Sequence, residues 1–334
     1  MTKTFISVII PVRNEAAHIG QVLDALLRQR YPSELFEILV IDGCSTDNTR
    51  ELVTAYQQRH AQVRLFGNPK RLSSAARNIG IDNFRGDIFL LIDGHCLIDN
   101  DNLFGVIDRA FQDETIDCLG RPQPLELRNA NAIQLAIAAA RRSPLGHHPD
   151  SFIYANKPCI APAISIAVAY RRCVFERVGR FDETFDAAED AEFNYRCDKA
   201  EQRCLFEPES AIRYVPRKTI SGLFRQLVRY GRGRIKLTRK HPETFSLKST
   251  LPAFFVAGVT IGIIPAMLSW IFCGLYLTVL LLYAAIILAE TIRQAIQNRN
   301  WTFIFLLPVI FTTIYISSGT GLLAEVFFGR KRTE

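Results

Sequence analysis

The stretch Ile88-Phe89-Leu90-Leu91-Ile92-Asp93-Gly94-His95-Cys96 decides the fold. Its apolar first half is typical of a strand buried on both faces, and it ends abruptly in an acid, a glycine and an imidazole. Strands of a parallel α/β sheet point their carboxyl ends at the ligand crevice, so we expect Asp93 and His95 to emerge there on the same side. Such a pair could clamp a divalent cation that holds a phosphate group. The alternative is an ordinary turn with a capping acid.

Strands and helices alternate in the sequence before this stretch. Residues 5–10 read as a buried strand that Pro11 ends, and residues 37–41 read as a second strand that runs into Asp42. The other elements expected are helices over 19–27, 49–60 and 71–80 and a short strand over 62–66. This alternation predicts an α/β fold with an open, mostly parallel central sheet.

The sequence after residue 96 is less regular. Residues 100–142 have a helical pattern with a strand near Cys118, and residues 143–162 hold four prolines and the pair His147-His148, which predicts a loop over the crevice. A strand over 164–170 follows. Glu189 and Asp190 then begin a helix, where the helix dipole favours acids whether or not they do chemistry.

Several classes of protein are disfavoured by what the sequence lacks. It has no G-x-G-x-x-G and no Walker motif, which argues against a dinucleotide oxidoreductase and a P-loop kinase. Its eight cysteines form no C-x-x-C pair, so they read as small apolar core residues in a reducing compartment. The first residues lead straight into a strand rather than a signal peptide, and we expect the N-terminal part to stay in the cytosol.

Positive charge is concentrated in one segment of the 334-residue chain, whose formal net charge is +7. Ten Lys and Arg and no acid lie between Ser210 and Pro242, directly before the chain turns strongly apolar. Basic residues that adjoin a hydrophobic span favour anionic lipid headgroups over nucleic acid. A merely solvated basic face is the alternative.

Long uncharged runs follow this basic segment. Residues 251–289 are 39 residues without a charge, about twice the ~20 that cross a bilayer once, and residues 302–324 are a further 23. We expect two or three spans, at about 251–268, 270–289 and 302–324. With three crossings the basic tail at 327–334 lies outside the cell, against the usual bias, whereas two crossings return it to the cytosol. Burial in a soluble helical domain is the alternative.

The motifs taken together resemble the inverting, membrane-associated family-two glycosyltransferases, which use a nucleotide-diphosphosugar on a GT-A type sheet. Each matching stretch is weak alone, but their order and spacing make the set specific: residues 7–15, 40–47, 76–78, 93–95, 189–190 and 226–230. The resemblance implies a cytosolic GT-A domain over 1–215, a basic amphipathic interfacial segment over 216–248, C-terminal transmembrane helices within 249–326 and the basic tail at 327–334.

Within the family the sequence is similar to the ExoA type of succinoglycan glucosyltransferase, which carries Asp-x-His where relatives have Asp-x-Asp. Asp93 and His95 then match the metal and diphosphate clamp, and imidazole favours Mn²⁺ over Mg²⁺, although either cation is expected. Tyr230 replaces the more usual tryptophan of Q-x-x-R-W and keeps an aromatic platform.

The resemblance also implies roles for residues in the donor site. Pro11 and Glu15 match the first loop under the donor base, and Asp42 matches the acid that recognises its uracil or ribose. Asp42 could instead be a plain helix-capping acid, a role we expect for Asp47. Arg77 could reach the pyrophosphate, with a surface salt bridge as the alternative.

The remaining matched residues concern the chemistry and the acceptor. Asp190 matches the general base, and Glu189 could orient it or be an ordinary first-turn acid. The motif that closes over the donor diphosphate and the acceptor is matched by Gln226, Arg229 and Tyr230, whose alternative role is to bind lipid phosphates. His147 and His148 fit a solvated proline-rich loop better than an acceptor cleft.

These assignments imply an enzyme of the bacterial inner membrane whose catalytic domain faces the cytosol. It would transfer a hexose, with glucose from UDP-glucose favoured, to a lipid-linked saccharide in exopolysaccharide assembly, beside other polysaccharide-assembly proteins. A processive polysaccharide synthase and a polyprenyl-phosphate sugar synthase are alternatives within the fold. A non-catalytic nucleotide-sugar-binding membrane scaffold is the alternative from another class, and nucleic acid is not an expected partner.

Overall fold

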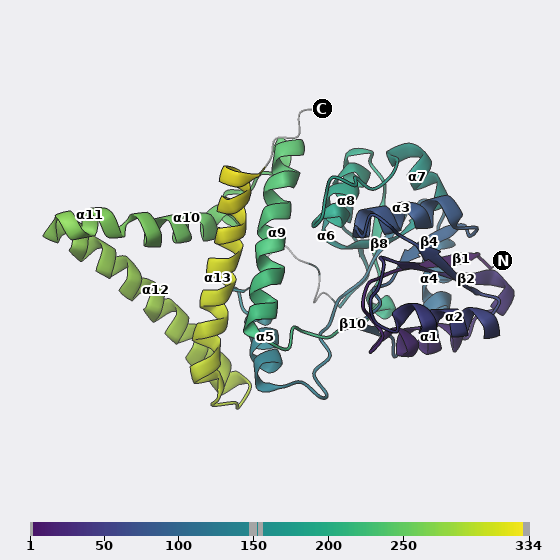
Figure 1. Cartoon of the computed structure of the whole chain (residues 1–334), viewed down its shortest axis with the longest axis horizontal. Coiled ribbons are helices and arrows are strands. Elements are labelled where there is room, and N and C mark those ends of the chain that lie inside the picture. Colours follow the sequence, from purple (N-terminus) through teal and green to yellow (C-terminus); the bar gives the residue numbers. More distant parts are fainter. Residues whose placement is uncertain (1–2, 147–151, 153–155, 330–334) are drawn as a thin grey trace. The chain divides into compact units, whose positions relative to one another are not determined.

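The chain divides into two compact units in a computed structural model that describes residues 3–146, 152 and 156–329. The first unit is residues 1–126 with 151–215, and the second is residues 127–150 with 216–334 (Figure 1). The predicted unbroken domain over 1–215 therefore needs one correction. Residues 127–150 group with the second unit because the apolar face of α5 (Ala132–Arg142) packs against the C-terminal helix.

The first unit is built on an eight-stranded sheet in the order β3-β2-β1-β4-β8-β6-β9-β7. Its first four strands in this order run parallel, and β8 then pairs antiparallel with both β4 and β6. A separate pair, β5 (Cys96–Leu97) with β10 (Arg213–Tyr214), is antiparallel. The bounds of the eight are β1 Ile6–Val12, β2 Phe36–Asp42, β3 Val63–Gly67, β4 Ile88–Leu91, β6 Cys118–Gly120, β7 Cys159–Ile160, β8 Ala167–Arg171 and β9 Cys204–Phe206.

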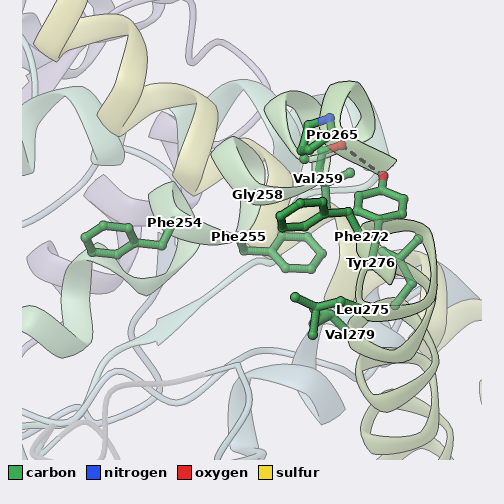
Figure 2. A pocket seen from close by; sticks show the side chains of 11 residues that line it. Phe254, Phe255, Gly258, Val259, Pro265, Phe272, Leu275, Tyr276 and Val279 are labelled. Atoms are coloured by element: carbon green, nitrogen blue, oxygen red, sulfur yellow. Dashed lines mark hydrogen bonds between the residues drawn. The ribbon is translucent and has the colours of Figure 1, made fainter. Parts of the chain in front are cut away.

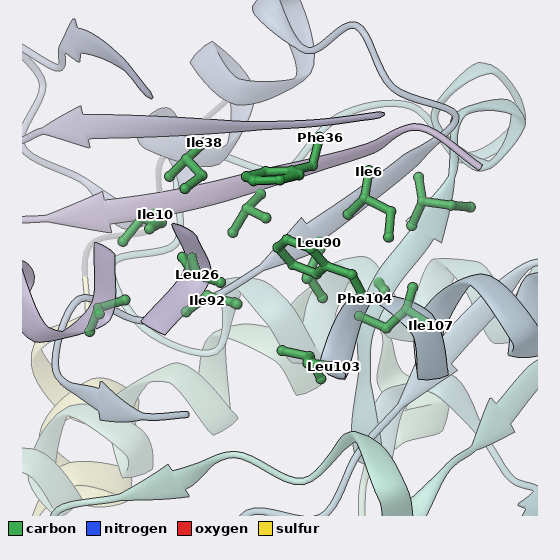
Figure 3. Packing of buried hydrophobic residues seen from close by; sticks show 14 of the residues in the cluster. Ile6, Ile10, Leu26, Phe36, Ile38, Leu90, Ile92, Leu103, Phe104 and Ile107 are labelled. Atoms are coloured by element: carbon green, nitrogen blue, oxygen red, sulfur yellow. The ribbon is translucent and has the colours of Figure 1, made fainter. Parts of the chain in front are cut away.

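Helices cover both faces of this sheet, which explains why its strands read as continuous apolar runs. Alternate residues of one strand serve opposite faces: Ile6, Val8 and Ile10 pack in one cluster and Ile9 in the other. The first cluster lies under α1 (Ile19–Leu27), α2 (Thr49–Arg59) and α4 (Leu103–Phe111), and Figure 3 shows Leu26, Phe104 and Ile107 meeting Ile10, Leu90 and Ile92. The second lies under α3 (Ser73–Asn83), α6 (Ala163–Ile166), α7 (Arg172–Val178) and α8 (Glu189–Lys199).

Two predicted strand boundaries were wrong. The strand β1 continues through Pro11 to Val12, paired with Ile41 and Asp42 of β2. The N–H that Pro11 lacks would face β4. The hydrogen bonds between β1 and β4 end at Ile9, with Ile92 N donating to Ile9 O at 3.1 Å, so the proline interrupts none of them. The strand predicted over 164–170 begins only at Ala167, because residues 163–166 form a short helix whose first amides are bonded by Asp198.

The second unit is helical. Beside α5 it contains α9 (Ile220–Lys240), α10 (Leu247–Ile261), α11 (Ile263–Leu268), α12 (Trp270–Gln297) and α13 (Phe303–Phe328). Three stretches, residues 247–268, 270–297 and 303–328, are long and apolar enough to cross a membrane. The predicted break near residue 269 is confirmed, since Ser269 is extended between α11 and α12. Short 3-10 turns complete the chain at Ser33–Leu35, Pro208–Ser210 and Pro242–Thr244.

Gly86 allows the close approach of β4 to the start of β1, and this can be tested. A Cβ at this position would lie 2.6 Å from Phe5 O and 2.8 Å from Ser7 Oγ, so Gly86→Ala must push the two strands apart. We expect a loss of about 1–3 kcal/mol, seen as a lower Tm of the detergent-solubilised full chain. Gly67→Ala at the end of β3 is the matched control, because nothing lies within 4 Å of its Cβ. Equal Tm values for the two variants would contradict this account.

Candidate active site

The Asp93-Gly94-His95 loop follows β4 and is pressed against the end of β1. A Cβ on Gly94 would lie 2.8 Å from Val12 Cγ1, so only glycine permits this approach. The approach brings His95 to Glu15, with His95 Nδ1 2.9 Å from Glu15 Oε1. A proton on Nδ1, donated to the carboxylate, puts the lone pair of the ring on Nε2. Glu15, predicted to serve the donor base, is therefore also the partner that orients His95.

The loop that carries Glu15 is fastened to the loop after β2. Glu15 N donates to Thr49 Oγ1 at 2.8 Å, and Thr46 N donates to Asn14 Oδ1 at 2.8 Å. Asn14 itself has a φ of 58°, the left-handed region that asparagine tolerates better than most residues. These bonds fix where Glu15 lies relative to the sheet edge.

Asp47 has a wider role than the helix cap predicted for it. Asn48 is the N-cap residue of α2 and makes no side-chain capping bond. Asp47 instead accepts hydrogen bonds from Thr49 Oγ1 at 2.5 Å, from Thr49 N at 3.1 Å and from Ala16 N at 3.2 Å. The bond from the Thr49 hydroxyl is the largest cause of a lowered pKa of Asp47. Asp47 thus joins the loops after β1 and β2.

Asp42 ends β2 as a buried acid, 1% exposed. It accepts a hydrogen bond from Ser45 N at 3.1 Å, and the exposed side chain of Arg50 approaches it to 3.5 Å. The hydrogen bond from Ser45 N resembles a cap of the following loop. A capping role does not require the carboxylate to be buried, and burying a carboxylate is costly. Recognition of the donor base or ribose by Asp42 stays a prediction.

A buried cation organises the acids at the start of α8. Arg77 on α3 lies 3.1 Å from Glu189 Oε1 through Nη1, close enough for an ion pair although the N–H is not aligned as a hydrogen bond. Its guanidinium also lies over the ring of Phe181, 5.2 Å from the centroid. Arg77 is 12% exposed at its side chain, so the alternative of a surface salt bridge does not apply.

The electrostatics of this cluster favour Asp190 as a base. Burial alone lowers the pKa of Arg77, but the charges of Glu189, Asp190 and Asp93 outweigh it and raise that pKa. The pKa of Asp190 is raised, chiefly because surrounding protein desolvates it, and the charges of Glu189 and Asp93 add to this while Arg77 opposes it. The Asp190 side chain nevertheless keeps access to solvent, as a base that must meet a substrate requires.

The backbone before these acids is strained. Ala188, the N-cap residue of α8, has a φ of 62°, in the left-handed region that alanine rarely adopts. No side chain caps the helix there. Strain of this kind collects where a functional geometry is imposed on the chain.

Sequence reasoning missed Arg121, the largest fully buried side chain. Its Nη2 donates to Leu91 O at 3.0 Å and to Tyr214 OH at 3.3 Å, which ties the end of β4 to β10. Burial raises the pKa of the Tyr214 hydroxyl, and the charge of Asp93 adds to this. In the sequence Arg121 stands between Gly120 and Pro122, and an arginine beside a proline does not indicate burial.

The other predicted residues lie outside the first unit or outside the described residues. Gln226, Arg229 and Tyr230 lie on α9 in the second unit, where Gln226 Nε2 donates to Tyr230 OH at 3.0 Å and Arg217 Nε donates to Gln226 Oε1 at 3.0 Å. Their contact with a donor stays a prediction. His147, His148 and the basic residues at 330–332 are not among the described residues.

The residues of the Asp93 loop fit a divalent cation that arrives with a diphosphate. Asp93 and His95 offer one carboxylate and one imidazole, and among the described residues no group of three or more His, Cys, Asp or Glu side chains could hold an ion. A cation bound by one or two side chains completes its shell with substrate phosphates and water. The contact of His95 with Glu15 supplies the outer partner that metal-ligating histidines usually have.

Comparison with known proteins identifies the family. The family model described as "Glycosyl transferase family 2" matches residues 7–167, and "Glycosyl transferase family group 2" matches residues 147–315, half of the chain. The chain belongs to glycosyltransferase family 2. It is thus an enzyme of polysaccharide or glycoconjugate biosynthesis, and the predicted GT-A type fold and family are confirmed.

Two curated relatives of this glycosyltransferase match over most of their length. The succinoglycan biosynthesis protein ExoA of Rhizobium meliloti is 29% identical over 302 residues, covering 90% of this chain and 88% of the relative. A dolichyl N-acetyl-α-D-glucosaminyl phosphate 3-β-D-2,3-diacetamido-2,3-dideoxy-β-D-glucuronosyltransferase of Methanococcus voltae is 27% identical over 311 residues, 92% of each chain.

A solved structure shares the fold. The mannosyltransferase PcManGT from Pyrobaculum calidifontis, in complex with GDP-Man and Mn²⁺, has a TM-score of 0.60 at 18% sequence identity and covers 97% of this chain and 88% of its own. At this identity the likeness supports the architecture and not the specificity.

The coupling of Glu189 to Asp190 predicts a shift in the pH profile. The charge of Glu189 raises the pKa of Asp190, so Glu189→Gln should lower that pKa and move the acid limb of kcat/KM to lower pH. Glu176→Gln on α7, an exposed acid with the same change in charge, is the control and should leave the limb in place. A limb that stays, or that moves to higher pH in Glu189→Gln, would refute the coupling.

Proposed function

We propose that this glycosyltransferase moves a hexose, with glucose favoured, from a UDP-sugar to a lipid-linked saccharide in bacterial exopolysaccharide assembly, with inversion at the anomeric carbon. The observation that carries the proposal is the Asp190 carboxylate, accessible to solvent yet raised in pKa beside buried Arg77. A binding module has no need of such a base. The catalytic domain would face the cytosol at the bacterial inner membrane.

The proposed reaction is a single displacement. Asp190 takes the proton of an acceptor hydroxyl while that oxygen attacks the anomeric carbon. The bond from this carbon to the nucleoside diphosphate breaks, and its electron pair leaves with the diphosphate oxygen. Attack from the opposite face inverts the centre, so an α-linked donor gives a β-linked product. Arg77 and Glu189 act as positioning residues, because their ion pair holds the first turn of α8 and tunes the charge around Asp190.

The donor would lie across the carboxyl edge of the sheet. Pro11 and Asp42 would receive the nucleoside, and Asp93 and His95 would hold Mn²⁺ or Mg²⁺, with Glu15 orienting His95. A bound cation supplies charge stabilisation to the leaving diphosphate. Gln226, Arg229 and Tyr230 would close over the diphosphate and the acceptor from α9.

The relatives support the acceptor class. ExoA is named for succinoglycan biosynthesis, and the Methanococcus protein is named for transfer to a dolichyl-linked phosphosugar. The Methanococcus name agrees with a saccharide carried on a lipid, and the ExoA name agrees with polysaccharide biosynthesis. The GDP-mannose in the Pyrobaculum structure makes GDP-sugars the necessary comparison for the donor.

Replacing the base should abolish transfer while the protein stays folded. Asp190→Asn should lower kcat by about 10²–10⁴-fold with labelled UDP-glucose, other UDP-sugars or GDP-mannose, lipid extract and Mn²⁺, since the amide cannot accept the proton. Asp101→Asn at the exposed Arg30–Asp101 pair is the control. Full transfer by Asp190→Asn would remove Asp190 as the base. Donor binding without transfer by the wild-type chain would favour the scaffold, and transfer from GDP-mannose alone would overturn the UDP assignment.

The clamp makes a separate prediction about metal. Glu15→Gln should weaken Mn²⁺ binding in the presence of UDP by about 10–100-fold, because the histidine loses the carboxylate that orients it. His95→Asp should stay active and shift its preference from Mn²⁺ toward Mg²⁺, since oxygen replaces nitrogen as the ligand. Titration followed by electron paramagnetic resonance measures Mn²⁺ binding, and transfer assays with Mn²⁺ or Mg²⁺ measure the activity and metal preference of His95→Asp, with His60→Asp as the control. A folded but inactive His95→Asp protein would count against the clamp.

A further inference from the structure

The helices α9 and α13 lie side by side and run in the same direction (Figure 1). At their beginnings Leu223 packs in one cluster with Leu307 and Phe311. In the middle the backbones touch, because a Cβ on Gly231 would lie 2.5 Å from Ser318 O and one on Gly321 would lie 2.3 Å from Val228 O. Close packing through glycine thus joins the two helices along most of their length.

Their ends are held by a buried acid. Glu325 on α13 is 3% exposed, and Arg232 Nε donates to its Oε2 at 3.1 Å while Arg239 Nη1 lies 3.6 Å from its Oε1. Arg239 Nη2 also donates to Glu325 O at 2.8 Å and to Val326 O at 3.1 Å, so a side chain of α9 caps the last turn of α13. Wherever α13 lies in a membrane, α9 must lie with it.

The positive charge of α9 keeps this helix out of the hydrocarbon layer of a membrane. Its 21 residues include seven Lys and Arg and no acid, and Arg225, Arg229 and Lys240 are among its exposed side chains. Several charges at the depth of the acyl chains are prohibitively costly, whereas the same charges beside anionic headgroups are favourable. A bilayer surrounding an upright α13 would surround these arginines as well.

The helices α10, α11 and α12, which carry no charge between residues 251 and 289, leave this pair as a hairpin (Figure 1). The α10 arm contacts α13 near the middle, where Gly319 lies against Pro252 O. The α12 arm packs along the first half of α13: Tyr283 OH donates to Thr312 Oγ1 at 3.3 Å, and Ile287 lies in one cluster with Leu307. Away from this base the arms meet each other, with Tyr276 OH donating to Val259 O at 2.9 Å across an apolar pocket of about 260 Å³ (Figure 2). No residue from 247 to 286, all within the described part of the chain, is buried.

We propose that α9 and α13 lie together in the plane of the membrane at the level of anionic headgroups, and that the α10–α12 hairpin alone enters the acyl chains. Length and composition qualify α13 as a span, but its fixed contact with α9 places it at the interface. The hairpin returns, so the chain ends on the side where α9 begins. This arrangement gives the basic tail the same side as the start of α9.

Tryptophan fluorescence can measure the depth of α13 directly. The chain has only two tryptophans, Trp270 at the hairpin tip and Trp301 before α13, so Trp270→Phe/Trp301→Phe gives a silent background. Single tryptophans replace the exposed residues Phe305, Ile316 and Phe328 in turn. Each protein is placed in vesicles of phosphatidylcholine and phosphatidylglycerol whose acyl chains are brominated near the headgroup or near the bilayer centre.

The two arrangements give different patterns. An in-plane α13 predicts that all three probes are quenched several-fold better by the shallow bromines, whereas Trp270, kept as the single tryptophan in the Trp301→Phe variant, is quenched better by the deep ones. A spanning α13 would instead make the probe at Ile316 the deepest, with Phe305 and Phe328 shallow, and this result would overturn the proposal. Absence of quenching at Trp270 would overturn it too.

A second measurement does not depend on these substitutions. Tags at the N- and C-termini of the unaltered chain should be cleaved by protease from the same side of sealed inverted vesicles. Opposite sides would refute the proposal. Neither readout uses catalysis, so both stand whether or not the donor and acceptor are those proposed above.

Discussion

The site depends on one buried cation. Arg77 lies behind the first turn of α8, paired with Glu189 and within the field of Asp190 and Asp93. Without it, the acids at the end of β4 and the start of α8 would lie near one another without a compensating positive charge, where surrounding protein desolvates Asp190. The positive charge of the guanidinium therefore offsets the negative charge of the carboxylates that the sheet edge and the helix bring together.

Much of the first unit could be predicted because its signals are local. Residues buried on both faces of a sheet leave an unbroken apolar run, so β1, β2 and β4 were found within two residues of their bounds. The polar residues that follow those strands were found for the same reason. The end of β1 was predicted too early because of Pro11. The cost of a proline in a strand depends on which neighbouring strand its missing N–H would face, and the sequence does not reveal the order of the strands.

Other features were hidden because they depend on distant partners. The ion pair of Arg77 with Glu189 joins residues more than a hundred positions apart, and Arg121 is buried only because β4 and β10 meet around it. The assignment of α5 to the second unit rests on helices formed nearly two hundred residues later. In α9 and α13, the glycines that set the close approach are unremarkable in sequence until the backbone opposite them is known.

The Glu15–His95 contact changes how the departure from Asp-x-Asp should be judged. Replacing an aspartate by a neutral imidazole removes one negative charge from the ligands of a cation. Glu15, which is hydrogen-bonded to the far nitrogen of the ring, supplies a negative charge in the second layer of residues around the cation. Seen as net charge rather than ligand type, the site loses little, and the position after Gly94 becomes free to vary in step with a residue in the loop after β1.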